Sequence, residues 1–388
     1  MLTNHLLSAD ERADLALFTE SLDRFCDAEI EPHYRDWERA GQVPRELFAR
    51  LGAQGYLCAD VPEAYGGPGA SVAFSFAVVE VLSRRGYAGF VGGLQVHNDI
   101  IPPYLLHFGT EAQRQHWLPR MASGEAIAAI GMTEPGAGSD LKNIRTTARR
   151  EGDHYVINGS KIFISNGQNA DLIVLAAKTD AAAGAKGVSL FLVDTRTPGF
   201  SRGRRLEKVG QHAGDTSELF FEDMRVPADA LLGGVEGQGF VQMMRELPRE
   251  RLIIGVQAIH GAKGALEQTV RYVQERQAFG QSVAQFQNTR FTLAQIATDI
   301  AAGEAFLNAG VHAYTLGQLT PDAASAIKLH TSELFSRVAD QCLQFFGGYG
   351  YMAEYPISRF WADARVLRIY GGTSEIMKEL VARALLGR

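Results

Sequence analysis

The chain has 388 residues, of which 46% are hydrophobic and 21% charged, and its formal net charge is −6. This balance is typical of a folded globular protein, and the length predicts two or three domains. The negative charge without basic runs argues against nucleic-acid binding, and no apolar stretch reaches the roughly 18 residues that indicate a membrane-spanning helix.

The first third of the chain has helical periodicity. Ser8 and Glu11 have the spacing of a capping box, and apolar residues then recur at three- and four-residue steps. These apolar residues are Leu15, Phe18, Leu22 and Phe25. A shorter helix is expected after Pro44, and the nearly all-apolar run 73–82 predicts a buried helix.

The N-terminal residues and the cysteines predict a compartment. Acidic residues by position 10 and the lack of an apolar segment predict neither a signal peptide nor a transit peptide. Cys26, Cys58 and Cys342 are far apart and odd in number, which favours buried, inert thiols over disulfides or metal ligands. We therefore expect a cytoplasmic protein, and no metal.

The middle third has the pattern of short strands. Two β-rich runs, 155–157 and 161–165, flank Asn158-Gly159, which predicts a hairpin with a turn at that dipeptide. Further strands are expected at 172–176, 188–193 and 217–221, and the β-region closes near Pro227.

Helical spacing returns at Gly239 and continues to the end of the chain. Pro248 predicts the start or a kink of a helix, which would place Glu250 and Arg251 in its first turn. Long helices are expected at roughly 250–276, 285–315 and 321–345. The order of elements predicts an α+β chain of three domains, with boundaries at 1–125, 126–235 and 236–388.

The segment Gly131–Asp140 is the strongest single motif, reading Gly-Met-Thr-Glu-Pro-Gly-Ala-Gly-Ser-Asp. Its glycines allow a tight loop whose backbone N–H groups approach a ligand closely. An ordinary turn between a helix and a strand would explain the segment almost as well.

This segment resembles the first signature of the acyl-CoA dehydrogenase family, and departs from it at Asn143, where the family usually has a smaller residue. The second signature is matched at Gln344, Gly347, Gly348, Gly350, Tyr351, Glu354, Arg359 and Asp363. The resemblance covers nearly the whole chain. It implies an N-terminal helical domain, a β-barrel-like middle domain and a C-terminal four-helix bundle.

Gly371 stands where many members of this family carry their catalytic glutamate. The segments 247–252 and 370–380 resemble the long-chain and isovaleryl branches, whose base lies on a helix of the C-terminal domain. The resemblance makes Glu250 the candidate base. The alternative is that Glu250 is an ordinary surface glutamate near the start of a helix. Glu246 competes less well because it precedes the expected break at Pro248. Glu250 and Gly371 should then face the same substrate carbon.

The resemblance also implies the residues that bind FAD and substrate. One set would line the flavin ring and pyrophosphate: Met132, Thr133, Ser139, Phe163 and Ser165. A second set would reach the cofactor of a neighbouring subunit: Arg276, Phe279, Gln287, Gln344, Gly347 and Gly348. Thr373 and Glu375 would turn towards the flavin, and the substrate contacts would be Ser139, Arg251 and Gly372.

The implied reaction is the α,β-dehydrogenation of an acyl-CoA to the trans-2-enoyl-CoA, as in β-oxidation. Glu250 would take the α-proton while hydride passes to flavin N5, and electrons would leave to an electron-transferring flavoprotein. The resemblance further implies a homotetramer and a medium-chain, long-chain or branched acyl group. A flavin oxidase or monooxygenase, and a catalytically silent acyl-CoA-binding protein, are the alternatives.

Overall fold

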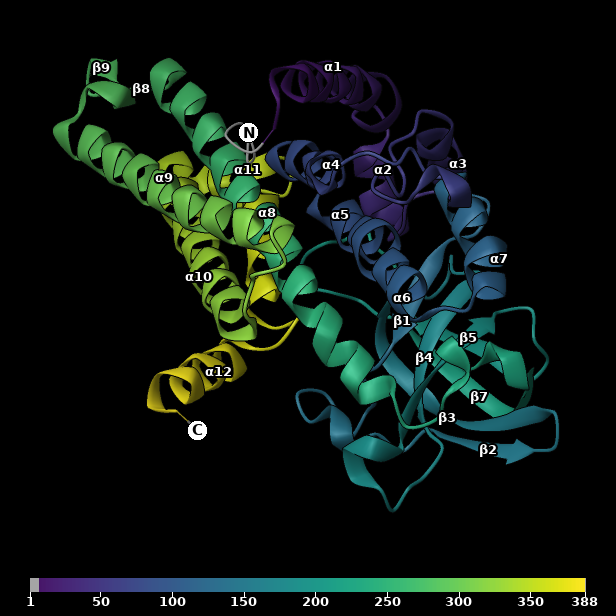
Figure 1. Cartoon of the computed structure of the whole chain (residues 1–388). Helices are drawn as coiled ribbons and strands as arrows, with labels where there is room; N and C mark the ends of the chain where they lie inside the picture. The colour runs from purple at the N-terminus through teal and green to yellow at the C-terminus, as the bar shows by residue number, and fades with distance from the viewer. Residues whose placement is uncertain (1–6, 388) are drawn as a thin grey trace.

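The computed structural model describes residues 7–387 and confirms the predicted order of helices, strands and helices (Figure 1). Residues 1–6 belong to the segment in which the sequence predicts no signal peptide, and they lie outside the described part. The N-terminal helices are α1 (Ala9–Phe25), α2 (Tyr34–Ala40), α3 (Glu46–Ala53), α4 (Val72–Arg84), α5 (Ala88–Gln95), α6 (Ile101–Phe108) and α7 (Glu111–Ala122).

Helix α1 begins where the capping box predicts. The Glu11 N–H donates to the Ser8 hydroxyl at 3.2 Å, and the Ser8 N–H donates to Glu11 Oε2 at 3.0 Å. Two groups that a helix start leaves unpaired are thereby satisfied. The expected helix after Pro44 is α3, and the expected buried helix over 73–82 is α4.

The middle part is a curled sheet. Its strands are β1 (Ala128–Gly131), β2 (Thr147–Glu151), β3 (His154–Ser165), β4 (Leu172–Lys178), β5 (Val188–Asp194), β6 (Phe200–Arg205) and β7 (Thr216–Pro227). The strand order is β1-β4-β2-β3-β7-β6, with β5 also paired to β4. β1 runs parallel to β4, whereas β3 is antiparallel to both β2 and β7.

The predicted hairpin turn at Asn158-Gly159 is wrong. Both residues lie inside the continuous strand β3, at a shift of register against β7. The Asn158 side chain exchanges two hydrogen bonds with Asp223 of β7, of 2.8 and 3.0 Å, which holds the strand straight across the dipeptide. A Cβ at Gly159 would lie 2.4 Å from Thr146 Oγ1, so the glycine serves a bulge and not a turn.

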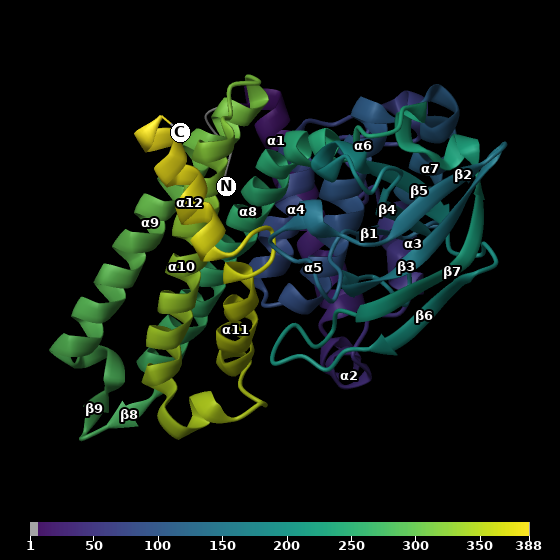
Figure 2. The same ribbon diagram turned by 90° about the horizontal axis from the view of Figure 1, so that it is seen from below.

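The C-terminal part is helical. Its helices are α8 (Gly239–Glu275), α9 (Gln287–Thr315), α10 (Pro321–Phe346), α11 (Pro356–Ala364) and α12 (Ser374–Leu386). The strands β8 (Gln277–Ala278) and β9 (Gln281–Ser282) form a small hairpin between α8 and α9. Figures 1 and 2 show this hairpin at the end of the helical part that lies away from the sheet.

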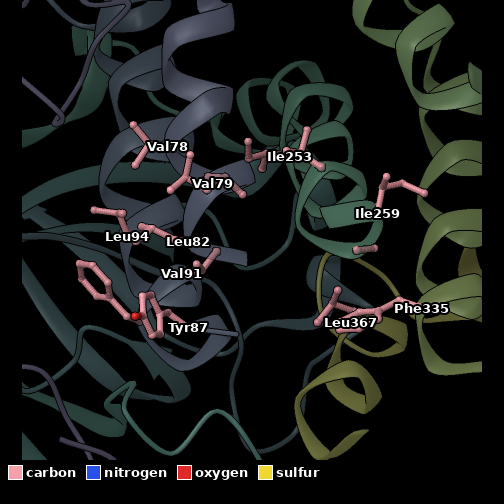
Figure 3. Close-up of a cluster of buried hydrophobic side chains, with 14 of the residues drawn as sticks. Val78, Val79, Leu82, Tyr87, Val91, Leu94, Ile253, Ile259, Phe335 and Leu367 are labelled. Carbon is pink, nitrogen blue, oxygen red and sulfur yellow. The ribbon is translucent and has the colours of Figure 1, made fainter. Parts of the chain in front are cut away.

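One continuous apolar core joins the N-terminal helices to the C-terminal helices. In Figure 3, Val78 and Val79 of α4 lie across from Ile253 of α8, and Phe335 of α10 lies beyond Ile259. Each such side chain contributes about 1.5–3 kcal/mol on burial. Helix α8 is therefore held on two sides, and it extends from the helices to the sheet (Figure 1).

The expected helix start at Pro248 is also wrong, because α8 runs through it. Proline cannot donate to the carbonyl four residues earlier, which belongs to Met244. The Met244 side chain is 37% exposed, so solvent reaches that face, while the opposite face of α8 is buried. Packing thus outweighs the lost hydrogen bond, and Glu250 lies in the helix interior and not in its first turn.

Two further expectations concern thiols and membranes. The three cysteines are free and buried, as predicted. Over residues 7–387, every helix is too short or too polar to cross a bilayer.

Pro248→Ala restores an N–H that can donate to the Met244 carbonyl. We expect the free energy of unfolding to rise by about 1–3 kcal/mol in urea or thermal unfolding. Gln274→Ala, at an exposed position of the same helix, should change it by only a few tenths of a kcal/mol. A Pro248→Ala variant no more stable than the parent would contradict this account of the helix.

Candidate functional site

Glu250 is buried near the middle of the molecule. It lies on α8 with 7% of its surface exposed, and its Oε1 accepts a hydrogen bond of 2.9 Å from the hydroxyl of Tyr104 on α6. Tyr104 is itself fully buried. The carboxyl group is thus withdrawn from water and oriented by one phenol.

This environment makes Glu250 a weaker acid. Burial raises its pKa to about 7, the nearby carboxylate of Glu246 adds to the rise, and the Tyr104 hydrogen bond and Arg251 oppose it. A pKa near neutrality suits a group that must both hold and release a proton.

Glu246 is closer to Glu250 than the sequence indicated. Because α8 continues through Pro248, the two glutamates lie one turn apart on the same face of one helix. Glu246 is 4% exposed, and its Oε1 lies 2.8 Å from Nδ1 of His107. Contrary to the prediction from the sequence, no helix break separates Glu246 from Glu250.

The loop at Gly371 packs against the same part of α8. The Tyr370 hydroxyl donates to Gln257 Oε1 at 2.7 Å, and Arg251 Nε lies 3.5 Å from the Gly371 carbonyl oxygen. A Cβ built on Gly371 would lie 2.3 Å from Cδ1 of Ile254, which is one turn beyond Glu250. The structure therefore brings Gly371 beside the turn of α8 that follows Glu250, while the expectation that both residues face one substrate carbon stays a prediction.

Lys328 is a site residue that the sequence analysis missed. It is fully buried on α10, and its Nζ donates to the Gly372 carbonyl at 2.6 Å. Burial lowers its pKa to about 8, and the nearby Arg251 lowers it further. Lysine between Ile327 and Leu329 on an apolar helix was a signal that could have revealed it. Tyr104 had no such signal.

The Gly131–Asp140 loop is held by a buried ion pair. Glu134 accepts hydrogen bonds from Lys161 Nζ at 2.7 Å and from the backbone N–H of Thr146 at 3.0 Å. Lys161 also donates to the Met132 carbonyl at 3.1 Å. The anchored loop leaves Ser139 exposed, and Cβ atoms built on Gly136 and Gly138 would meet only open space.

Phe163 on β3 combines two unusual features. Its side chain is 64% exposed, and its φ is +62°, which an aromatic residue rarely adopts. The Ile162 N–H donates to the Thr133 carbonyl at 3.0 Å, so Phe163 lies beside the Gly131–Asp140 loop, which is the glycine-rich loop of the sheet. The positive φ falls where the register of β3 against β7 shifts, between Lys161 and Ile164.

The predicted cofactor residues fall into separate groups. Met132, Thr133 and Phe163, with Ser139 and Ser165, lie on the sheet and its loop, whereas Thr373 and Glu375 begin α12 beside the Gly371 loop. The remaining members lie around the end of the C-terminal helices: Arg276, Phe279, Gln287, Gln344, Gly347 and Gly348.

This last group forms an exposed surface away from the sheet (Figures 1 and 2). Arg276 lies over the ring of Tyr349 at 5.8 Å, which joins the hairpin to the glycine-rich end of α10. Phe279 is 97% exposed with φ +51°. Within one chain these residues do not meet Phe163.

The sequence matches three family models. They are "Acyl-CoA dehydrogenase, N-terminal domain" over residues 12–125, "Acyl-CoA dehydrogenase, middle domain" over 129–224 and "Acyl-CoA dehydrogenase, C-terminal domain" over 237–386. The chain is 45% identical over 373 residues to the long-chain specific acyl-CoA dehydrogenase, mitochondrial, of Sus scrofa. That match covers 95% of this chain and 86% of the relative.

Solved structures share the fold. A glutaryl-CoA dehydrogenase from Mycobacterium smegmatis in complex with FADH2 is 31% identical with a TM-score of 0.91, and the match covers 100% of this chain and 97% of that one. A chain in a structure described as the electron transferring flavoprotein of Acidaminococcus fermentans is 35% identical with a TM-score of 0.94. That match covers 100% of both chains.

Gly371→Ala tests the close contact with Ile254. The left-handed φ of +64° costs an alanine about 1–2 kcal/mol, and the contact with Cδ1 adds to the loss of stability. Gly317→Ala is the matched control, because its φ is +67° and its Cβ would meet open space.

Adding Ile254→Val to Gly371→Ala removes the crowding atom and should recover the extra loss in thermal unfolding. Equal losses for the Gly371 and Gly317 variants would contradict the close contact.

Proposed function

The chain belongs to the acyl-CoA dehydrogenase family, and from this premise we propose that it oxidises an acyl-CoA thioester to the trans-2-enoyl-CoA with Glu250 as the base. The observation that carries the proposal is the buried Glu250 carboxyl, with a pKa of about 7, beside the Gly371 loop. A Cβ built on Gly371 would meet Ile254, which is one turn beyond Glu250 on α8. The family's enzymes are oxidoreductases.

FAD is the cofactor of acyl-CoA dehydrogenases, and the residues present fit it. Phe163 offers an exposed ring beside the glycine-rich loop, and Thr133 and Ser139 offer hydroxyls on that loop. Gly136 and Gly138 leave room for a ligand to approach the backbone. When bound, FAD supplies the acceptor for the hydride that leaves the β-carbon.

Glu250 has the properties that removal of an α-proton requires. With a pKa of about 7, a large share of the carboxyl is ionised at neutral pH and can accept the proton. Once protonated, it is neutral, and burial then stabilises it. Tyr104 holds the carboxyl in one orientation throughout, and the burial of both groups keeps water away from the reacting carbon.

The carbonyl of the thioester needs donors that stabilise charge as the α-proton leaves. Lys328 and Arg251 hold the carbonyl oxygens of Gly372 and Gly371, which fixes the direction of this backbone. We propose that the fixed loop places its N–H groups towards the substrate. Arg251 and Ser139 are the further substrate contacts that the family resemblance supports.

The relatives support proposals for the acyl group and the electron acceptor, and the positions of the cofactor residues support one for the assembly. The similarity to a long-chain specific enzyme supports a medium-chain, long-chain or branched acyl group, and a role in β-oxidation. The structural match described as an electron transferring flavoprotein supports such a protein as the acceptor. The separation of Arg276 and Phe279 from Phe163 supports an oligomer in which one subunit completes its neighbour's cofactor site. The homotetramer and the cytoplasmic location stay predictions.

Glu250→Gln removes the base and keeps the shape of the side chain. We expect the purified variant to keep its yellow FAD spectrum, and anaerobic bleaching of the flavin by acyl-CoA to slow by about 10²–10⁴-fold. Glu304→Gln, which removes a carboxylate paired with Lys263 on the C-terminal helices, should bleach at the parental rate.

Bleaching of Glu250→Gln at the parental rate would overturn the assignment of the base. Rapid oxygen consumption by the reduced parent would favour the flavin oxidase instead.

Tyr104→Phe removes the hydrogen bond that opposes the raised pKa of Glu250. The pKa should then rise above about 7, so the acidic limb of the pH–rate profile should move to higher pH. Stopped-flow reduction of the flavin across pH measures this limb. Tyr155→Phe removes a buried hydroxyl bonded to Glu236 in the sheet and should leave the limb in place. A limb that moves to lower pH in Tyr104→Phe would contradict the role of this hydroxyl.

A further inference from the structure

Two residues of α6 face two glutamates of α8. Tyr104 donates to Glu250 at 2.9 Å, and His107 Nδ1 lies 2.8 Å from Glu246 Oε1. The spacing of three residues on α6 and four on α8 places each pair one helical turn from the other. The base therefore has a neighbouring hydrogen-bonded pair, which links the same two helices as its own hydrogen bond does.

This second pair connects the base to the surface. The Glu246 side chain is 5% exposed, whereas that of His107 is 43% exposed. Glu246 interacts electrostatically with Glu250 strongly enough to raise its pKa. The imidazole is thus the solvent-facing end of a row of groups that ends at the buried base.

We propose that His107 and Glu246 are positioning residues that set how readily Glu250 gives up or accepts a proton. Imidazole is the side chain whose charge ordinarily changes near neutral pH. A protonated His107 offsets the charge of Glu246 and favours ionised Glu250, whereas a neutral His107 leaves that charge to oppose it. The inference rests on the proposed function, in which Glu250 is the base.

The other charged groups nearby have partners of their own. Arg249 of α8 lies 2.7 Å from Asp60, 3.7 Å from Asp99 and 3.3 Å from the Tyr314 hydroxyl of α9. Arg245 lies over the ring of Phe108 at 5.3 Å. On the other side of Glu250, Arg251 faces the Gly371 carbonyl and Ser325, and Lys328 of α10 faces Gly372. His107 and Glu246 are not among these partners.

Substitutions of the two partners should act in opposite directions. Glu246→Gln removes the charge that opposes ionisation of Glu250. The acidic limb of the pH–rate profile should therefore move to lower pH by about half a unit, which makes flavin reduction on that limb about threefold faster. His107→Gln keeps a hydrogen-bonding side chain but removes the balancing charge, so reduction there should become about threefold slower. The double variant should behave as Glu246→Gln does.

His116→Gln on α7 is the matched control, because Nε2 of His116 lies 3.3 Å from Nη1 of Arg120 and not beside a carboxylate of the site. It should leave the limb in place. Shifts of the two single variants in the same direction, or no shift in either, would overturn the proposal. A purely structural role would lower the rate at every pH without moving the limb.

A second readout separates this inference from the proposed function. Infrared difference spectra of each variant, with and without Glu250→Gln, follow the C=O stretch of the protonated Glu250 carboxyl across pH without any turnover. The titration of Glu250 could move in opposite directions in the His107 and Glu246 variants while the parent fails to oxidise acyl-CoA. That result would uphold the role of His107 and Glu246 and overturn the proposed function. An unmoved titration in a protein that does oxidise acyl-CoA would overturn the pair alone.

Discussion

The burial of the Glu250 carboxyl is the constraint on which the site depends. An ionised carboxylate loses much of its hydration when it is withdrawn from water, and Tyr104 supplies one hydrogen bond in return. The balance leaves the group with a pKa of about 7. That balance holds only if α6 and α8 keep their separation, which the apolar cluster that joins Leu105 of α6 to Met243 of α8 provides.

The loop at Gly371 packs against α8, the helix that carries this carboxyl. Its backbone passes so close to α8 that a side chain at Gly371 would meet Ile254, and its carbonyls are held by Arg251 and Lys328. Gly371, which stands where many members of the family carry their catalytic glutamate, thus packs against the helix that carries Glu250. The buried Lys161–Glu134 pair fixes the glycine-rich loop of the sheet in a comparable way.

Much of the fold could be predicted from periodicity and capping, since these are local. The two errors arose where distant contacts outweigh local preference. Asn158 is bonded across the sheet to Asp223, and Pro248 is carried inside a helix whose opposite face is buried. For the site, motif similarity predicted Glu250 as the base, but Tyr104 and His107 come from a helix far earlier in the chain, and no spacing rule relates them to α8.

The release of label from the α-carbon tests the central claim most directly. The holoenzyme is mixed with an acyl-CoA that carries deuterium at the α-carbon, and deuterium appearing in water is measured by NMR. With Glu250 as the base, the parent should release label during turnover, and Glu250→Gln should release none above the enzyme-free background. Release at the parental rate from Glu250→Gln would show that another group removes the α-proton and would contradict the account.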